Sequence, residues 1–258
     1  MVLLFQPAEE DGSGAAAVIA DPRFGSIAPD WAFALHNMSG VPFGQMALRA
    51  GPVNCASMGL RIVLTGRTAH ASAPETGVSP GLALARVIPA LGALGTGGAV
   101  EPGFRLATVT HARLGEPAFG VAPSHGEVWV TLRTLLDAEM AGLLAGAEAL
   151  ARAEAGPGLT LEMTPHDVFA ACENDRQATA VLARAAAATG LGDWPHGLPF
   201  RASEDFGRFG AVGARSAMLF LGAGVDGPML HNPDYDFPDQ LIGPGVRLFD
   251  HVLREILG

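Results

Sequence analysis

The stretch MGLRIVLT, residues 58–65, decides the fold, because it starts a unit unlike the chain before it. Its apolar and β-branched residues predict a buried strand. The patterns that follow predict a helix, two alternating strands, a second helix with Asp137 as its N-cap, and a last strand. We expect these elements at residues 79–94, 104–111, 127–134, 137–154 and 159–164. The order β-α-β-β-α-β is that of a ferredoxin-like sandwich, in which two helices cover one face of a sheet.

The segments on either side of this unit have the pattern of a larger α/β domain. Before it, we expect strands at residues 2–5, 31–36 and near 45–49, with a helix at 14–20. After it, we expect helices at 175–189, 203–209 and 241–257 and a strand at 217–221. The predicted fold class is therefore α/β. An open, mostly parallel sheet is built from residues 1–52 and 166–258, and a ferredoxin-like α+β domain, residues 53–165, is inserted into it.

Composition restricts the class of protein. The chain has 258 residues, 49% of them hydrophobic and 16% charged, which indicates a globular, well-packed protein. A formal net charge of −10 argues against a nucleic-acid or anionic-membrane partner. The uncharged stretch at residues 87–100 is too short to cross a bilayer. No basic region precedes the apolar N-terminus, and Cys55 and Cys172 have no second pair, so we expect a cytoplasmic protein with two buried thiols.

Two adjacent carboxylates, Glu9 and Glu10, follow the strand expected at residues 2–5. Like charges at a sheet end disfavour each other, and loss of solvent adds to the cost. A cation removes that cost, and hydrolytic metal sites need one carboxylate as a ligand and another as a general base. The alternative is a solvated pair at the start of a helix, where the helix dipole favours acids.

Two histidines strengthen the metal interpretation. His36 and His231 lie in similar Leu-His-Asn settings, each next to a predicted strand end. A single histidine after an apolar strand is usually structural. Two of them together with an acidic pair favour a shared site, because ligands in open α/β sheets gather at the carboxyl ends of strands. One carboxylate with two imidazoles suits zinc, manganese or nickel.

Six motifs occur in order along the chain: FQPAEE at residues 5–10, LHN at 35–37, TAHA at 68–71, SEDF at 203–206, FLGAG at 220–224 and LHNP at 230–233. This series resembles the metal-dependent amidohydrolases of the aminoacylase family of metallopeptidases. That family includes hippurate hydrolases, N-acyl-amino-acid deacetylases and indole-acetyl-amino-acid hydrolases. The resemblance extends over essentially the whole chain and is specific for the family, but it does not identify the substrate.

The resemblance implies a two-metal catalytic domain with an inserted lid domain that mediates homodimerisation. It assigns Glu9 as the general base and Glu10, His36 and His231 as ligands of a divalent metal such as Mn, Zn, Ni or Co. It also implies that His70 reaches the active site of the neighbouring subunit and stabilises the oxyanion. The implied substrates are N-acyl amino acids or small peptide-like amides, which are hydrolysed by an activated water.

The chain departs from the family pattern in two places. The family carries a His-x-Cys-Gly-His-Asp segment upstream of the acidic pair, whereas this chain starts eight residues before Glu9 and has no such segment. We therefore expect the N-terminal part of the catalytic domain to be missing, fewer than two ions to be bound, and hydrolysis to be impaired. The alternative is an inactive remnant that acts as a dimerisation or binding module. In addition, Gly120 lies where the family tends to have an asparagine.

Three further residues are candidates for binding the substrate. Arg133, at the end of the strand expected at 127–134, could bind a substrate carboxylate, and an ordinary strand-end ion pair is the alternative. Ser203 and Glu204 could line the pocket, or they could simply open a helix whose dipole favours acids.

Overall fold

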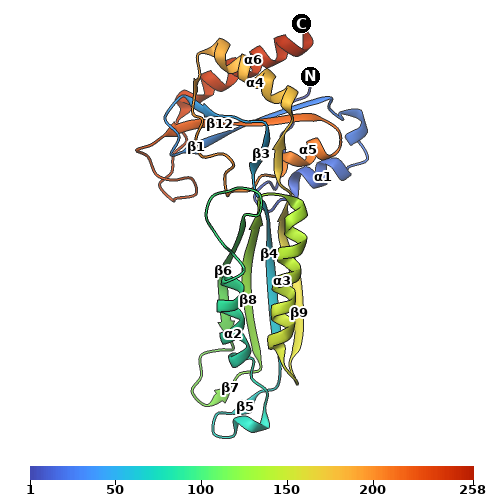
Figure 1. Cartoon of the computed structure of the whole chain (residues 1–258), viewed down its shortest axis with the longest axis vertical. Helices are drawn as coiled ribbons and strands as arrows, with labels where there is room; N and C mark the ends of the chain where they lie inside the picture. The colour runs from blue at the N-terminus through green and yellow to red at the C-terminus, as the bar shows by residue number, and fades with distance from the viewer. The chain divides into compact units, whose positions relative to one another are not determined.

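The computed structural model describes all 258 residues and divides them into two compact units. Unit 1 consists of Met1–Cys55 and Ala171–Gly258, and unit 2 consists of Ala56–Ala170 (Figure 1). The sequence patterns predicted these boundaries between the two units after residues 52 and 165. Each unit has hydrophobic clusters of its own, so each is described by itself.

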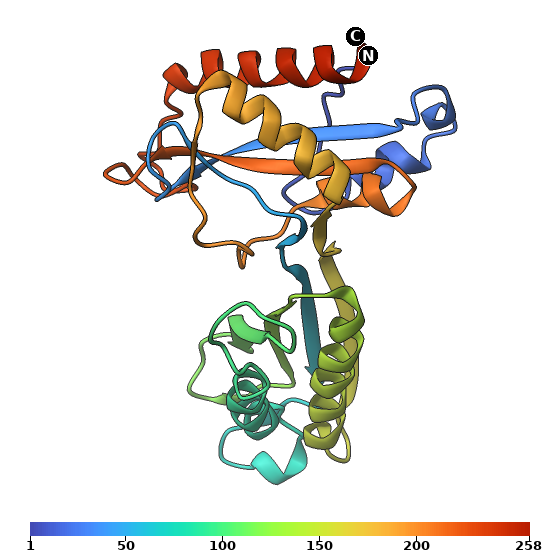
Figure 2. The ribbon, with the colours of Figure 1, turned by 45° about the horizontal axis from the view of Figure 1, so that its top comes forward.

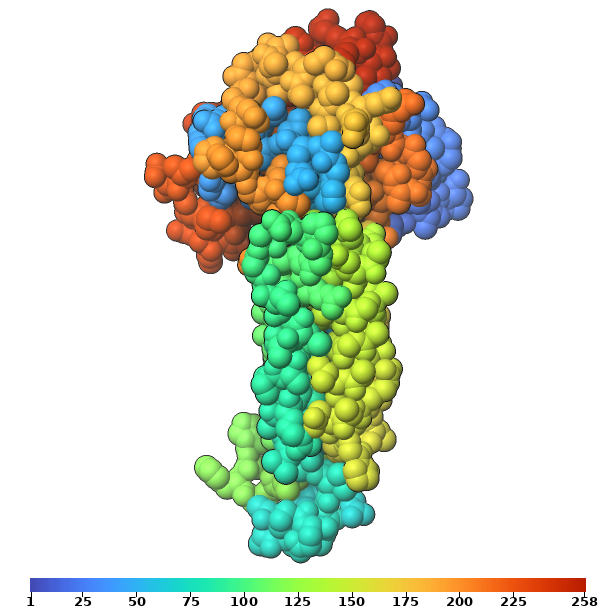
Figure 3. Space-filling model, in the orientation of Figure 1, coloured from blue at the N-terminus to red at the C-terminus, as the bar shows by residue number.

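Unit 2 is a ferredoxin-like sandwich, as the sequence predicted. Its main elements are β4 (Ala56–Thr65), α2 (Gly81–Gly92), β6 (Arg105–Leu114), β8 (His125–Thr134), α3 (Asp137–Ala155) and β9 (Thr160–Phe169). The sheet has the order β6-β8-β4-β9, and every neighbouring pair is antiparallel. The helices α2 and α3 run side by side over this unit (Figure 3). A short pair of strands, β5 (Ala69–His70) and β7 (Val121–Ala122), lies outside the sandwich.

The alternation of residues 58–65 explains which face of the sheet is covered. Every second residue from Met58 to Leu64 belongs to a core cluster shared with α2 and α3. On the other face, Arg61 pairs with Glu127 at 2.7 Å. The N-cap of α3 lies one residue earlier than expected, because Leu136 takes that position and Asp137 is already helical.

Unit 1 contains a four-stranded sheet in the order β1-β12-β2-β11. Its strands are β1 (Trp31–Ser39), β12 (Arg215–Gly224), β2 (Gln45–Ala47) and β11 (Gly192–Asp193). The ladder between β1 and β12 is parallel and long, and only the two residue pairs between β12 and β2 are antiparallel. The predicted open, mostly parallel sheet is therefore confirmed. A separate antiparallel pair, β3 (Gly51–Asn54) and β10 (Cys172–Asn174), lies next to the crossings between the units.

Helices cover the sheet of unit 1. α4 (Arg176–Thr189) and α6 (Ile242–Leu257) lie on the same face of β1 and β12 (Figure 2). Side chains from these helices and from β12 form one cluster: Val181, Leu182, Leu219, Leu221, Leu248 and Val252. The short helices α1 (Gly14–Ala20) and α5 (Arg208–Ala211) share another cluster around Phe209. None of the helices in either unit has the length and apolar character needed to span a bilayer.

Two expected elements of unit 1 differ in the structure. Residues 2–5 form no strand, and Phe5 is 90% exposed. A strand needs a neighbour that accepts and donates its backbone hydrogen bonds, and residues 2–5 pair with no strand of this sheet. The helix expected at 203–209 is instead a turn of 3₁₀ helix, η3 (Asp205–Gly207), followed by α5.

Candidate functional site

A tight loop carries Glu9 and Glu10. Two backbone hydrogen bonds fold it, from Gly12 N to the carbonyl of Glu9 at 2.8 Å and from Gly14 N to the carbonyl of Ala8 at 2.9 Å. A Cβ atom at Gly14 would lie 2.0 Å from the carbonyl oxygen of Pro7, so only glycine fits where this loop enters α1. The glycines of this segment therefore allow the backbone to return on itself beside the acidic pair.

Glu204 lies against this loop and forms a hydrogen bond with Glu9. Burial, together with the charge of Glu9, raises the pKa of Glu204 to about 8. Burial and the charge of Glu10 also raise the pKa of Glu9, while the hydrogen bond from Glu204 opposes that rise. At neutral pH the Glu204 carboxyl therefore retains its proton and donates it in a hydrogen bond to the Glu9 carboxylate.

His36 lies near the carboxyl end of β1. Its Nδ1 is in hydrogen-bond contact with the backbone carbonyl of Asn37, and a carbonyl can only accept, so Nδ1 carries the proton. The Nε2 atom lies 3.5 Å from Oε1 of Glu204. Burial lowers the pKa of His36, so the ring is neutral at pH 7. A neutral imidazole with a free Nε2 is the form that ligates metals.

His231 lies in the loop that follows β12. β1 and β12 are parallel, so His36 and this loop lie toward the same edge of the sheet. The backbone of His231 has a φ of +70°, a conformation that residues other than glycine seldom adopt. The loop is tied to β1, because Asn37 Nδ2 donates a hydrogen bond to the hydroxyl of Tyr235. The imidazole of His231 is close enough to Glu9 and His36 to influence the pKa of each.

The structure thus gathers several of the predicted site residues in unit 1, from segments far apart in sequence. They are Glu9, Glu10, His36, Glu204 and His231. Ser203 is half-buried beside Glu204. His70 and Arg133 belong to unit 2. His70 is exposed, with its Nδ1 2.7 Å from the hydroxyl of Ser72, and Arg133 is half-buried on β8.

Sequence reasoning treated Glu204 only as a pocket residue and assigned nothing to Asp205. The structure shows Glu204 hydrogen-bonded to Glu9 and beside His36, and it buries Asp205 directly behind the acidic loop. The motif SEDF was visible in the sequence. Its contacts with residues almost 200 positions away were not.

The chemistry of this cluster fits a divalent cation. Besides burial, the charge of Glu10 raises the pKa of both Glu9 and Glu204, and these carboxyl groups lie next to a neutral imidazole with a free Nε2, so a positive charge would stabilise the cluster. The side chains are not arranged for it, however, since no three carboxylate, imidazole or thiol groups in the structure are placed to hold one metal ion. Binding of a shared ion therefore requires side chains of the cluster to turn.

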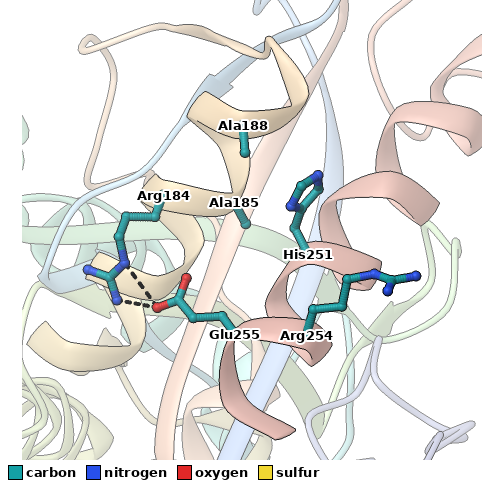
Figure 4. Close-up of a pocket in the computed structure, with 6 residues that line it drawn as sticks. All are labelled: Arg184, Ala185, Ala188, His251, Arg254 and Glu255. Carbon is teal, nitrogen blue, oxygen red and sulfur yellow. Dashed lines mark hydrogen bonds and ion pairs between the residues drawn. The ribbon is translucent and has the colours of Figure 1, made fainter. Parts of the chain in front are cut away.

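A surface hollow of about 360 Å³ lies elsewhere in unit 1, between α4 and α6 (Figure 4). It is lined by Arg184, Ala185, Ala188, His251, Arg254 and Glu255. Arg184 and Glu255 pair with each other there. None of the predicted site residues lines this hollow, so it is not part of the candidate site.

An α/β unit with carboxylates and imidazoles gathered beside its parallel strands, interrupted by a ferredoxin-like unit, defines a metallopeptidase-type hydrolase fold. Comparison with known proteins identifies the family. The model of peptidase family M20/M25/M40 matches residues 1–255, and the chain belongs to this family. The resemblance inferred from the six motifs is therefore confirmed.

Individual relatives agree with this assignment. The chain is 29% identical to the hippurate hydrolase of Campylobacter jejuni, over 96% of this chain and 64% of that protein. A putative aminohydrolase of methicillin-resistant Staphylococcus aureus has the same fold, with a TM-score of 0.79, 22% identity, and coverage of 98% of this chain and 66% of that one. A dinuclear metal-binding M20 peptidase of Bacillus subtilis matches with a TM-score of 0.73, 20% identity, and coverage of 96% and 62%. The chain thus spans somewhat less than two thirds of the length of these three proteins.

Proposed function

We propose that this protein hydrolyses the amide bond of N-acyl amino acids or of small peptide-like amides with the help of a divalent metal. The observation that carries the proposal is the gathering of Glu9, Glu10 and Glu204 with two imidazoles in unit 1, where Nε2 of His36 lies 3.5 Å from Oε1 of Glu204. Membership of the M20 family supports it. The substrate class follows from the relative named hippurate hydrolase, since hippurate is an N-acyl amino acid.

In this proposal Glu10, His36 and His231 hold the ion, which is manganese, zinc, nickel or cobalt. When bound, such an ion supplies a Lewis acid that polarises the scissile carbonyl and makes water a better nucleophile. His36 is prepared for this role, because its hydrogen bond to the carbonyl of Asn37 holds the proton on Nδ1 and leaves Nε2 free.

Glu9 has the properties of a general base. Its pKa is raised and so lies closer to the working pH. A carboxylate takes up and returns protons most effectively when its pKa is near that pH. Glu9 would accept a proton from the attacking water at a carboxylate oxygen and later deliver it to the leaving amine. Glu204 orients Glu9 through the hydrogen bond between them, and Ser203 and Glu204 would border the substrate.

The role proposed for residues 53–165, most of which belong to unit 2, is that of a lid and dimerisation domain. His70 would reach the site of a partner subunit and donate to the oxyanion, and Arg133 would bind the substrate carboxylate. Support comes from the exposure of His70 and from large apolar side chains on unit 2: Leu82, Leu114, Phe119 and Val121 are all exposed. A homodimer through this unit would cover such side chains. The two cysteines are buried and form no disulfide, which suits a cytoplasmic location.

A substitution at Glu9 tests the proposed activity. Purified wild-type chain and the Glu9→Gln variant are assayed with N-acetyl and N-benzoyl amino acids, with manganese or zinc supplied. We expect wild-type hydrolysis, and a loss of about 10²- to 10⁴-fold in Glu9→Gln, as for removal of a general base. Glu101→Gln, at an exposed position of unit 2, serves as the matched control and should keep wild-type activity. Wild-type hydrolysis no faster than that of Glu9→Gln would refute the activity.

A further inference from the structure

Asp205 is a buried carboxylate that closes the acidic loop at both ends. It is 1% exposed and lies in η3. The side-chain amide of Gln6 donates to Oδ1 at 2.7 Å and to Oδ2 at 2.8 Å, and the backbone N–H of Ala15 donates to Oδ2 at 2.7 Å. Gln6 precedes the loop at residues 7–14 and Ala15 follows it. One side chain, 190 or more positions away, thus holds both ends of the segment that carries Glu9 and Glu10.

The loop itself does not provide an equivalent constraint. Its backbone hydrogen bonds are local, and Ser13, the N-cap residue of α1, makes no side-chain capping bond. The hydroxyl of Ser13 is instead bound to Asp11. Asp205 therefore takes the place of the N-cap acceptor, and it uses a charged oxygen, which forms stronger hydrogen bonds than a neutral one.

The position of Asp205 in the chain links the loop to the rest of the cluster. Its neighbour Glu204 is hydrogen-bonded to Glu9, and Oε1 of Glu204 lies 3.5 Å from Nε2 of His36. The same short backbone segment therefore contacts the middle of the loop through Glu204 and both of its ends through Asp205. If the loop moves relative to η3, Glu9 and Glu10 move relative to His36.

We propose that Asp205 is a positioning residue, which acts through Gln6 and Ala15 to hold Glu9 and Glu10 in register with His36. That Asp205 holds the loop follows from its hydrogen bonds alone. That this matters for metal binding rests on the proposed function. Asp205 touches neither substrate nor ion in this role.

Two substitutions at Asp205 separate the effect of its hydrogen bonds from the effect of its negative charge. Asp205→Ala removes all three hydrogen bonds. In Asp205→Asn, the side-chain oxygen can still accept from Ala15, and the amide can donate to Gln6 once the Gln6 amide turns over. Gln6→Ala is a third variant, in which two of the three bonds are lost from a half-buried position, should Asp205→Ala fail to fold. Asp21→Ala, which removes a half-buried carboxylate paired with Arg23 at the other end of α1, is the control.

The first measurement is hydrogen–deuterium exchange of the amides of residues 8–15 in metal-free protein. The second is the Kd for Mn²⁺. We expect about tenfold faster exchange at residues 8–15 and about 10- to 100-fold weaker Mn²⁺ binding in Asp205→Ala, as for other residues that orient metal ligands. Gln6→Ala should shift both in the same direction, whereas Asp205→Asn and Asp21→Ala should remain near the wild type.

Unchanged exchange in both Asp205→Ala and Gln6→Ala would overturn the inference. It would also be overturned if exchange became faster in these variants while they bound Mn²⁺ as tightly as a wild-type chain of measurable affinity. A wild-type chain that binds no Mn²⁺ would instead count against the proposed function. In that case the exchange of residues 8–15 alone still decides whether Asp205 holds the loop.

Discussion

Nε2 of His36 lies 3.5 Å from Oε1 of Glu204, although the two residues are far apart in the sequence. Burial keeps the imidazole neutral, and the proton of Glu204 is directed to Glu9. Two atoms with free lone pairs therefore face each other, an arrangement that a cation would stabilise. The proton retained on Glu204 removes one negative charge from the cluster.

That proton makes the metal-free protein sensitive to pH. The pKa of Glu204 is raised to about 8 in the folded chain and is near the ordinary value of 4.5 when the chain unfolds. Between these two values the folded state binds more protons than the unfolded state, so the free energy of unfolding falls as pH rises. We expect the Tm of metal-free protein to fall between about pH 5 and 8, and Glu204→Gln, which stays uncharged, to flatten that decline.

Thermal unfolding of both proteins in chelator-treated buffer checks this expectation. Glu101→Gln, at an exposed site in unit 2, should decline with pH as the wild type does. Parallel pH profiles for wild type and Glu204→Gln would contradict a retained proton on Glu204.

Metal binding should depend on the imidazole of His36 and the carboxylate of Glu10. We expect His36→Ala and Glu10→Gln each to weaken the Kd for Zn²⁺ or Mn²⁺ by more than about 100-fold, since loss of a ligand exceeds the 10- to 100-fold effect of losing an outer-shell partner. Isothermal titration and an elemental metal count on protein purified without chelators measure this. His166→Ala, at an exposed position on β9, should bind as the wild type does, and equal affinity in all four proteins would exclude His36 and Glu10 as ligands.

The sequence predicted elements well where the information is local. In unit 2 the alternation of Leu60, Ile62 and Leu64 identifies the buried face, and the order of strands and helices then leaves few topologies. In unit 1 the helices at 14–20, 175–189 and 241–257 were expected within one residue of their observed bounds.

The failures have a common physical origin, which is dependence on distant partners. Residues 2–5 have the apolar pattern of a strand, but pairing decides whether a strand forms, and they have no pairing partner in this sheet. The hydrogen bonds of Asp205 with Gln6 join residues 199 positions apart. A single sequence carries no signal for such pairs, because periodicity and turn residues indicate local structure only.

The hydroxyl of Tyr235 should stabilise the loop that carries His231. Tyr235→Phe removes the hydrogen bond from Asn37 Nδ2 and leaves the half-buried ring in place. We expect a loss of about 0.5–1.5 kcal/mol in local stability, seen as faster amide exchange at residues 229–236. Exchange in α4, far along the chain from this loop, is the internal control. Unchanged exchange at 229–236 would show that the hydrogen bond does not hold the loop.

The close approach at Gly14 makes a last, purely steric prediction. In Gly14→Ala the new Cβ would lie 2.0 Å from the carbonyl oxygen of Pro7 and 2.8 Å from the amide nitrogen of Gln6, so the loop must shift. We expect a loss of about 1–3 kcal/mol in the free energy of unfolding, as for overpacked sites, because backbone atoms cannot move aside as a flexible side chain can. Gly25→Ala is the matched control, since nothing lies within 4 Å of its added Cβ, and it should leave stability near that of the wild type. Urea denaturation of the three proteins measures the difference. Because the clash falls on Gln6 and Pro7, Gly14→Ala should also weaken Mn²⁺ binding, whereas a variant with wild-type stability and affinity would show that the loop is free to rearrange.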